Sequence, residues 1–131
     1  MSMRSSFLGV ITISFMFLQG CGPARLDVTK TFNLSPGDVN AIDLPAQPVA
    51  QTINVEFTST AEKVSVFLFK EEDAKGEAGL TNADNSKALA KTLVSKDGKF
   101  SAEVPAKTAT RVVVWAGPRT TSVTVTVNNK K

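Results

Sequence analysis

Short segments in which apolar and polar residues alternate set the strongest constraint on how this chain can fold. In the segment 122–127, Val123, Val125 and Val127 alternate with serine and threonine, and residues 52–58 repeat the pattern with isoleucine, valine and phenylalanine. Successive side chains of a β-strand point to opposite faces, so a period of two indicates one buried and one solvated face. The pattern therefore predicts half-buried strands.

The same patterning recurs along the chain, and residues that form turns separate one segment from the next. Ser35-Pro36-Gly37-Asp38 interrupts the first segment, and Pro45 and Pro105 end two others. We expect about seven short strands with turn signals every 8–12 residues, at roughly 26–34, 52–58, 64–69, 90–95, 100–104, 111–116 and 122–127, with 42–44 as a short edge piece. This arrangement predicts an all-β fold, a small antiparallel β-sandwich of the jelly-roll or immunoglobulin-like type.

Two of the turns are expected to close hairpins. Asp97-Gly98 is a favoured pair for a two-residue type I′ turn, which would pair the strand 90–95 with the strand 100–104. Nearer the C-terminus, the segments 111–116 and 122–127 flank a Gly-Pro-Arg turn and are expected to form the last strand pair.

The segment Val64–Phe69 is apolar on nearly both faces. This is typical of a central strand, or of a strand whose outer face is covered by the loop that follows it. That loop, residues 71–87, is polar and is expected to be the longest irregular region. A single helical turn around 86–93 is an alternative to the strand 90–95, and we favour the strand because a hairpin signal follows at once.

The residue types that are missing limit the chemistry of the chain. It contains no histidine and a single cysteine, Cys21, so Ser–His–Asp catalysis, Cys–His catalysis and histidine-dependent zinc sites are excluded. One cysteine also cannot form an internal disulfide. The net charge is +3, and the basic residues are scattered among acidic ones instead of forming a stripe that could follow phosphates. We expect no enzyme activity, no cofactor and no nucleic-acid partner.

The first twenty residues have the layout of an export signal. Arg4 gives the N-terminal end a positive charge, and residues 7–18 form an apolar run of 12 residues. An apolar middle of about 7–15 residues behind a positive end is typical of a secretory signal peptide. The run is shorter than the roughly 20 residues that a membrane-spanning helix needs.

The end of this signal, Leu18-Gln19-Gly20-Cys21, resembles the lipobox of bacterial lipoproteins. In that family an aliphatic residue lies three positions before the cysteine and a small residue directly before it, and Leu18 and Gly20 match both. The resemblance implies cleavage between Gly20 and Cys21 and a diacylglycerol group on the Cys21 sulfur. It divides the chain into a signal peptide (1–20), a lipidated tether (21–25) and a single β-sandwich domain (26–131).

The residues after Cys21 bear on location and reach. The resemblance implies anchoring in the bacterial cell envelope, with the outer membrane facing the periplasm favoured because no aspartate follows the cysteine. The tether 22–25 extends at most about 14 Å. The domain is therefore expected to lie close to a membrane surface.

From Gln51 to Val127 the order of segments also resembles the pre-peptidase C-terminal-type domains of bacteria. The matching pieces are TINVEF, VSVFLF, DGKFSAEV and the closing RVVVWAGPRTTSVTVTV. That resemblance implies a small jelly-roll-like sandwich. The chain lacks the tyrosine that the family's closing hairpin commonly carries.

The only acidic concentration in the chain is the candidate metal site. Calcium prefers several oxygen ligands from one loop, so the candidate ligands are Glu71, Glu72, Asp73 and Asp84. Three neighbouring lysines and the absence of EF-hand spacing favour a solvated loop instead. The same carboxylates offer a glycosidase pair only if a pocket raises the pKa of one of them.

Trp115 is the single tryptophan and the candidate for ligand stacking. Together with Arg111 and Arg119 it could form a patch for a sugar face or a cation, and packing in the core or at its rim is the favoured alternative.

These observations predict a membrane-anchored lipoprotein that binds or supports a partner in the envelope, either another protein or a polysaccharide. The alternative is a calcium- or carbohydrate-binding module that uses residues 71–84 or the Trp115 hairpin.

Overall fold

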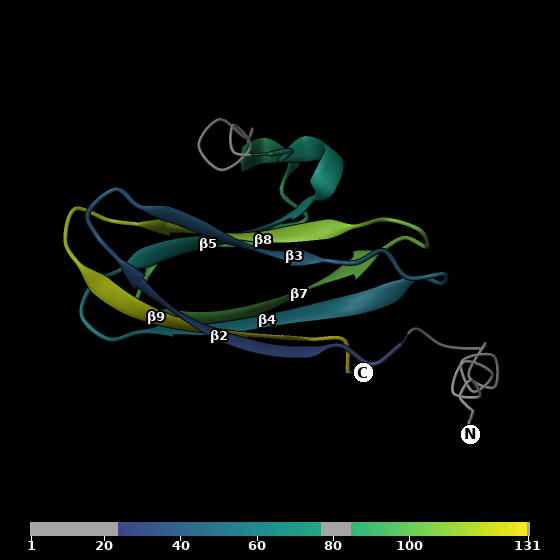
Figure 1. Cartoon of the computed structure of the whole chain (residues 1–131), viewed down its shortest axis with the longest axis horizontal. Coiled ribbons are helices and arrows are strands. Elements are labelled where there is room, and N and C mark those ends of the chain that lie inside the picture. Colours follow the sequence, from purple (N-terminus) through teal and green to yellow (C-terminus); the bar gives the residue numbers. More distant parts are fainter. Residues whose placement is uncertain (1–23, 77–84, 131) are drawn as a thin grey trace, which may run out of the picture.

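Two four-stranded antiparallel sheets pack face to face in a computed structural model that describes residues 24–76 and 85–130 (Figure 1). The predicted all-β sandwich is confirmed. About seven strands were expected and the described residues form eight: β2 (Asp27–Leu34), β3 (Val39–Leu44), β4 (Gln51–Ser59), β5 (Val64–Lys70), β6 (Ala90–Ser95), β7 (Asp97–Val104), β8 (Thr110–Ala116) and β9 (Thr121–Asn128). Two short 3₁₀ turns, η1 (Glu71–Asp73) and η2 (Asn85–Lys87), follow β5.

The strand order is that of a jelly roll. One sheet has the order β2-β9-β4-β7 and the other the order β3-β8-β5-β6. The first strand along the described chain pairs with the last, the second with the last but one, and so on inward: β2 with β9, β3 with β8, β4 with β7 and β5 with β6. The chain is one long hairpin, folded back between β5 and β6, that is rolled into two sheets.

The hairpin expected at Asp97-Gly98 is wrong. Both residues belong to β7 and lie opposite Thr58 and Phe57 of β4, while β6 pairs with β5 in the other sheet. A Cβ atom on Gly98 would lie 3.0 Å from the ring of Phe57. Gly98 is therefore not part of a turn. Its missing side chain leaves room within β7 for the ring of Phe57.

The expected pairing of the last two strands is also wrong. β8 lies between β3 and β5 in one sheet, and β9 lies between β2 and β4 in the other. Residues 117–120 carry the chain across the sandwich from one sheet to the other (Figure 1). Both strands are therefore central, which fits their runs of buried valine.

The main core fills the space between the two sheets. Val123, Val125 and Val127 of β9 are buried there, as the alternating pattern predicts. The other fully enclosed members come from the remaining strands: Leu34, Ile53, Val55, Phe57, Val64, Val66, Leu68, Val104, Val112 and Val114.

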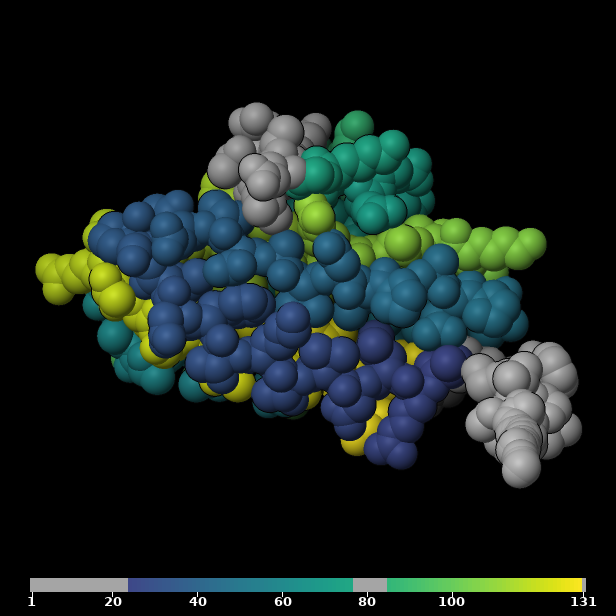
Figure 2. All heavy atoms as spheres, in the orientation of Figure 1, coloured from purple at the N-terminus to yellow at the C-terminus, as the bar shows by residue number. Residues whose placement is uncertain are grey.

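A second apolar cluster lies on the outer face of the β3-β8-β5-β6 sheet. Phe67, Phe69 and Val113 are buried there beneath Ala74, which follows η1. The Phe67 ring stacks on Phe69 at 5.7 Å and meets the edge of Trp115 at 5.9 Å. In Figure 2 the teal segment after β5 stands on this face. The expectations for 64–69 are confirmed: β5 is a central strand, and the following segment covers its outer face.

The outer face of the other sheet is polar. Across β2 and β9, the hydroxyl groups of Thr31 and Thr124 lie 3.0 Å apart, and those of Thr29 and Thr126 lie 3.3 Å apart. These side chains make pairs across the strands, and the face needs no cover.

In the part of the chain that the structure describes, no helix is long and apolar enough to cross a membrane.

Candidate functional site

A hollow of about 450 Å³ opens beside Trp115, at the end of the sandwich where β8 finishes. Its walls come from three chain crossings: the β4–β5 connection with the start of β5, the end of β6, and the end of β8 with the residues after it. The lining residues are Ala61, Glu62, Lys63, Val64, Ser65, Val94, Lys96, Trp115, Ala116, Gly117 and Pro118. The hollow is therefore mostly apolar, with Lys63 and Lys96 against the single carboxylate of Glu62.

One wall of the hollow is fixed by buried hydroxyl groups. The Ser59 and Thr121 hydroxyls lie 2.6 Å apart, and Ser59 donates to the Glu62 carbonyl oxygen at 2.5 Å. The Thr121 oxygen also accepts the backbone N–H groups of Ala61 and Glu62, each at 3.1 Å. The residues that form this wall are thus held in place by hydrogen bonds within the protein.

The lining of the hollow also contains a strained and exposed apolar residue. Val94 is 66% exposed and has a φ of 47°, in the left-handed region that β-branched residues avoid. The backbone N–H of Val94 donates to the Ser65 hydroxyl at 3.0 Å, a contact that helps to hold this conformation. Strained backbone of this kind persists where the surroundings fix it and is concentrated at functional sites.

Trp115 packs on the outer face of its sheet and also borders the hollow. Its ring contacts Phe67 in the second apolar cluster. The two arginines of the predicted patch do not join it there, since neither Arg111 nor Arg119 is among the lining residues.

Arg111 is instead engaged in structural contacts. Its Nε donates to the Asp43 carboxylate at 2.6 Å, and its Nη1 donates to the carbonyl oxygens of Ala74 and Gly76 at 2.8 and 2.7 Å. The hydrogen bond with Asp43 is the main cause that raises the pKa of the Arg111 guanidinium. Arg111 therefore ties the segment after η1 to the sheet.

The candidate metal ligands do not converge in the described structure. Glu71, Glu72 and Asp73 are consecutive residues of the single turn η1, so their side chains leave the axis about 120° apart. Among the residues in 24–76 and 85–130, no group of three or more acidic, histidine or cysteine side chains could hold a metal ion. Asp84 lies outside the described residues.

The lipobox residues Leu18, Gln19, Gly20 and Cys21 also lie outside the described residues. The structure begins at Ala24, whose backbone N–H donates to the side chain of Gln47 at 3.1 Å. Asn129 donates to the Ala24 carbonyl oxygen at 2.8 Å.

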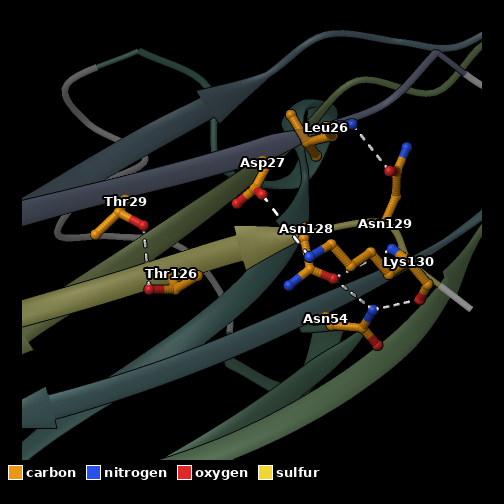
Figure 3. Close-up of polar contacts among 8 residues, drawn as sticks. All are labelled: Leu26, Asp27, Thr29, Asn54, Thr126, Asn128, Asn129 and Lys130. Carbon is orange, nitrogen blue, oxygen red and sulfur yellow. Dashed lines mark hydrogen bonds and ion pairs between the residues drawn. The ribbon is translucent and has the colours of Figure 1, made fainter.

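Sequence reasoning missed the hollow, although it singled out Trp115. Lys63, Val94 and Lys96 lie in three different parts of the sequence, and their meeting depends on which sheet each strand joins. It also missed the polar contacts around Asn54, Asn128 and Lys130 beside the termini (Figure 3), which line a second hollow of about 530 Å³. An expected hairpin at Asp97-Gly98 would have placed β6 in the wrong sheet.

No protein-family model matches the sequence, and no curated protein matches it either. Solved structures do match in shape. The periplasmic inhibitor of g-type lysozyme from Aeromonas hydrophila has a TM-score of 0.53 at 14% identity, over 84% of this chain and 90% of that one. The mitogen from Yersinia pseudotuberculosis has a TM-score of 0.53 at 9% identity, over 84% and 89%.

The pre-peptidase C-terminal domain of a Bacillus anthracis collagenase also matches in shape. Its TM-score is 0.52 at 13% identity, over 78% of this chain and 89% of that domain. The family resemblance noted in the sequence thus has a counterpart in the fold. At these identities the three matches show a shared β-sandwich fold and nothing more specific.

Proposed function

We propose that this chain is a lipid-anchored, non-enzymatic binding protein of the bacterial cell envelope, and that the hollow beside Trp115 receives part of an envelope protein. The observation that carries the proposal is the hollow itself, an apolar concavity with a tryptophan in its wall and two lysines beside it. Tryptophan is enriched among the residues that dominate binding energy at protein interfaces.

The composition of the hollow supports binding and not catalysis. Glu62 is its single carboxylate, and the chain has no histidine to act as a general base. A glycosidase would need two carboxyl groups that face each other across a cleft. The charged groups of this site, Glu62, Lys63 and Lys96, are suited to forming ion pairs with charged groups of a partner.

The lining favours a protein segment over a polysaccharide. Val94 and Pro118 offer apolar surface, and the hydroxyl of Ser65 already accepts the Val94 N–H. Sugar hydroxyls that lose water need many hydrogen bonds, because an unpaired buried polar group costs about 1–3 kcal/mol. An apolar side chain next to a carboxylate would match Trp115 together with Lys63 and Lys96.

The fold comparisons are compatible with this role. A periplasmic lysozyme inhibitor shares the β-sandwich, and its described activity is inhibition, which proceeds by binding. The envelope location proposed here rests on the signal peptide and the lipobox at Cys21.

The anchor is tested with Cys21→Ser expressed in a bacterium that processes lipoproteins. The expected result is an unprocessed or soluble chain, with mass spectrometry detecting a diacylglycerol group on the unaltered protein alone. If the serine variant is cleaved normally and still sediments with membranes, the anchoring proposal fails.

The hollow is tested by site-specific photocrosslinking in whole cells. A crosslinking amino acid at Pro118, on the rim, is expected to give a discrete protein adduct, and one at Thr29, on the polar face, is expected to give none. The double charge reversal Lys63→Glu with Lys96→Glu should reduce the adduct several-fold without unfolding the domain. Equal adducts at the two positions, or no effect of the reversal, would contradict the proposed site. Adducts with polysaccharide in place of protein would contradict the protein partner and support a polysaccharide partner.

A further inference from the structure

The N-terminal segment of the described chain is bound tightly to one end of the sandwich. Ala24 donates its N–H to the Gln47 side chain at 3.1 Å, and its carbonyl oxygen accepts from Gln47 at 3.5 Å and from Asn129 at 2.8 Å. Asn129 also accepts the backbone N–H of Leu26 at 2.9 Å (Figure 3). We call Gln47 and Asn129 the clamp.

The clamp pairs a buried amide, that of Gln47, with the half-buried amide of Asn129. Gln47 is buried, and Asn129 donates to the side chain of Gln51, which is buried as well. If residues 24–26 lifted away, these amide groups would lose partners inside the protein, and buried polar groups without partners are costly. Contacts with the domain therefore already include Ala24 and Leu26.

The clamp fixes which end of the domain lies near Cys21. Three residue steps separate Cys21 from Ala24, a span of at most about 11 Å. The clamp end comprises the β3–β4 connection (residues 45–50) and the β7–β8 connection (residues 105–109), which are joined by a hydrogen bond of 2.6 Å from the Lys107 N–H to the Gln47 carbonyl oxygen. Both termini of the described chain lie at this end (Figure 1).

The two connections are nearly uncharged, although they share a shallow hollow with Lys70, Glu71 and Glu72. Their sequences, PAQPVA and PAKTA, contain no carboxylate, and Lys107 is their single charged residue. Lys107 is exposed at the turn with a φ of 63°, in the left-handed region. The nearby Lys130 is already paired with Asp27, at 3.9 Å (Figure 3), so charge alone does not draw this end to a membrane.

The hollow beside Trp115 lies at the opposite end. β8 starts at Thr110, directly after the connection 105–109, and finishes at Ala116, which lines the hollow. Six residue steps of a strand span about 20 Å. The clamp end and the hollow thus lie at the two ends of the same strand.

We propose that the clamp holds the sandwich upright on the membrane, with residues 45–50 and 105–109 against the lipid headgroups and the Trp115 hollow facing away from the bilayer. This inference rests on the proposed lipid anchor at Cys21. A long free tether would let the domain tumble, whereas a clamped tether gives it one orientation. The hollow would then meet partners in the aqueous compartment and not lipids.

The orientation is tested on the native lipoprotein, reconstituted in vesicles of phosphatidylethanolamine and phosphatidylglycerol that carry a headgroup-attached quencher. Cys21 is the only cysteine, and acylation blocks it, so an added cysteine can be labelled alone. A fluorophore at Ala106→Cys, at the clamp end, is expected to be quenched several-fold more than one at Thr120→Cys, beside the hollow. Equal quenching, or the reverse order, overturns the orientation.

Two variants separate the clamp from the anchor. An eight-residue Gly-Ser insertion between Pro23 and Ala24 leaves the clamp contacts in place and should make the two labels equally quenched. Gln47→Ala with Asn129→Ala should do the same, provided that circular dichroism shows a folded domain. A difference that survives the insertion overturns the clamp argument. Protein that fails to float with the vesicles overturns the lipid anchor itself, which is a distinct outcome.

Discussion

The outer faces of the two sheets differ in how they meet solvent: one is polar and exposed, and the other is apolar and covered. The face formed by β2 and β9 is wet, and threonine hydroxyls pair across it, as Thr31 does with Thr124. The face formed by β5 and β8 is apolar and covered by the segment that contains η1 and Ala74. The difference teaches that the two sheets of one sandwich need not bury the same number of faces. Apolar and polar residues alternate along a strand with one buried face, whereas a strand with two buried faces is apolar throughout.

The largest effect is expected where the covered face is broken. Phe67→Ala removes a ring that is buried in the second cluster and contacts both Phe69 and Trp115. Truncation of a buried phenylalanine costs about 3–5 kcal/mol. Urea unfolding of the Cys21→Ser domain without its signal peptide measures the loss, and the fluorescence of Trp115 reports on the cluster directly. A loss no larger than that of Thr31→Ala would mean that the outer cluster does not stabilise the fold.

An intermediate effect is expected where the cover is fastened. Arg111→Ala removes the hydrogen bonds to Ala74 and Gly76 together with the contact to Asp43. A hydrogen bond to a charged group contributes about 1.5–3 kcal/mol to the free energy of unfolding. The Asp43 side chain is 64% exposed, so the ion pair alone adds little, and Asp43→Asn should cost less than about 1 kcal/mol. Faster amide exchange at Ala74 in the arginine variant, with little change in the asparagine variant, is the expected pattern.

The same contact has a defined pH dependence. Because Asp43 raises the pKa of Arg111 above its ordinary value, the guanidinium stays charged in the folded protein throughout neutral and moderately basic pH. The stability from this raised pKa is complete below the unfolded-state pKa and is lost only as the pH rises through the folded-state pKa. The cost of Arg111→Ala should therefore be equal at pH 7 and pH 9. A cost that falls by half across that range would contradict this assignment.

The smallest effect is expected on the wet face. Each of Thr31→Ala and Thr124→Ala should change stability slightly, with a coupling between them of about 0.2–1 kcal/mol, typical of a cross-strand pair. A double-mutant cycle in urea isolates that coupling. A cost comparable with that of Phe67→Ala would erase the contrast between the two faces.

The sequence predicts the strands well because each strand's pattern is local. The alternation in 52–58 and 122–127 and the apolar run in 64–69 each identify the correct strand and its buried side. Pairing is not local. Asp27 lies opposite Asn128, and Gln51 lies opposite Val104, which no turn signal reveals. The two turns that were expected to be hairpins connect different sheets.

The candidate site was less predictable than the fold. Trp115 was recognisable as the single tryptophan, but Lys63 and Lys96 become its neighbours only through the strand order. Gly98 shows the limit most clearly, because the same dipeptide that favours a tight turn also suits a strand that packs against a phenylalanine ring. The clamp residue Gln47 lies in the β3–β4 connection and Asn129 directly follows β9, and the sequence around them gives no sign of their partners.

The position of β9 has a consequence for how the protein is made. β9 is the last strand along the chain, yet it is a central strand of its sheet, between β2 and β4. During synthesis or export from the N-terminus, β2 and β4 wait without their shared neighbour until residues 121–128 have emerged. Sandwiches dominated by such distant pairings fold slowly, on a scale of about milliseconds to seconds. A chain that crosses a membrane in an extended form, N-terminus first, would therefore complete this sheet only after residues 121–128 have crossed.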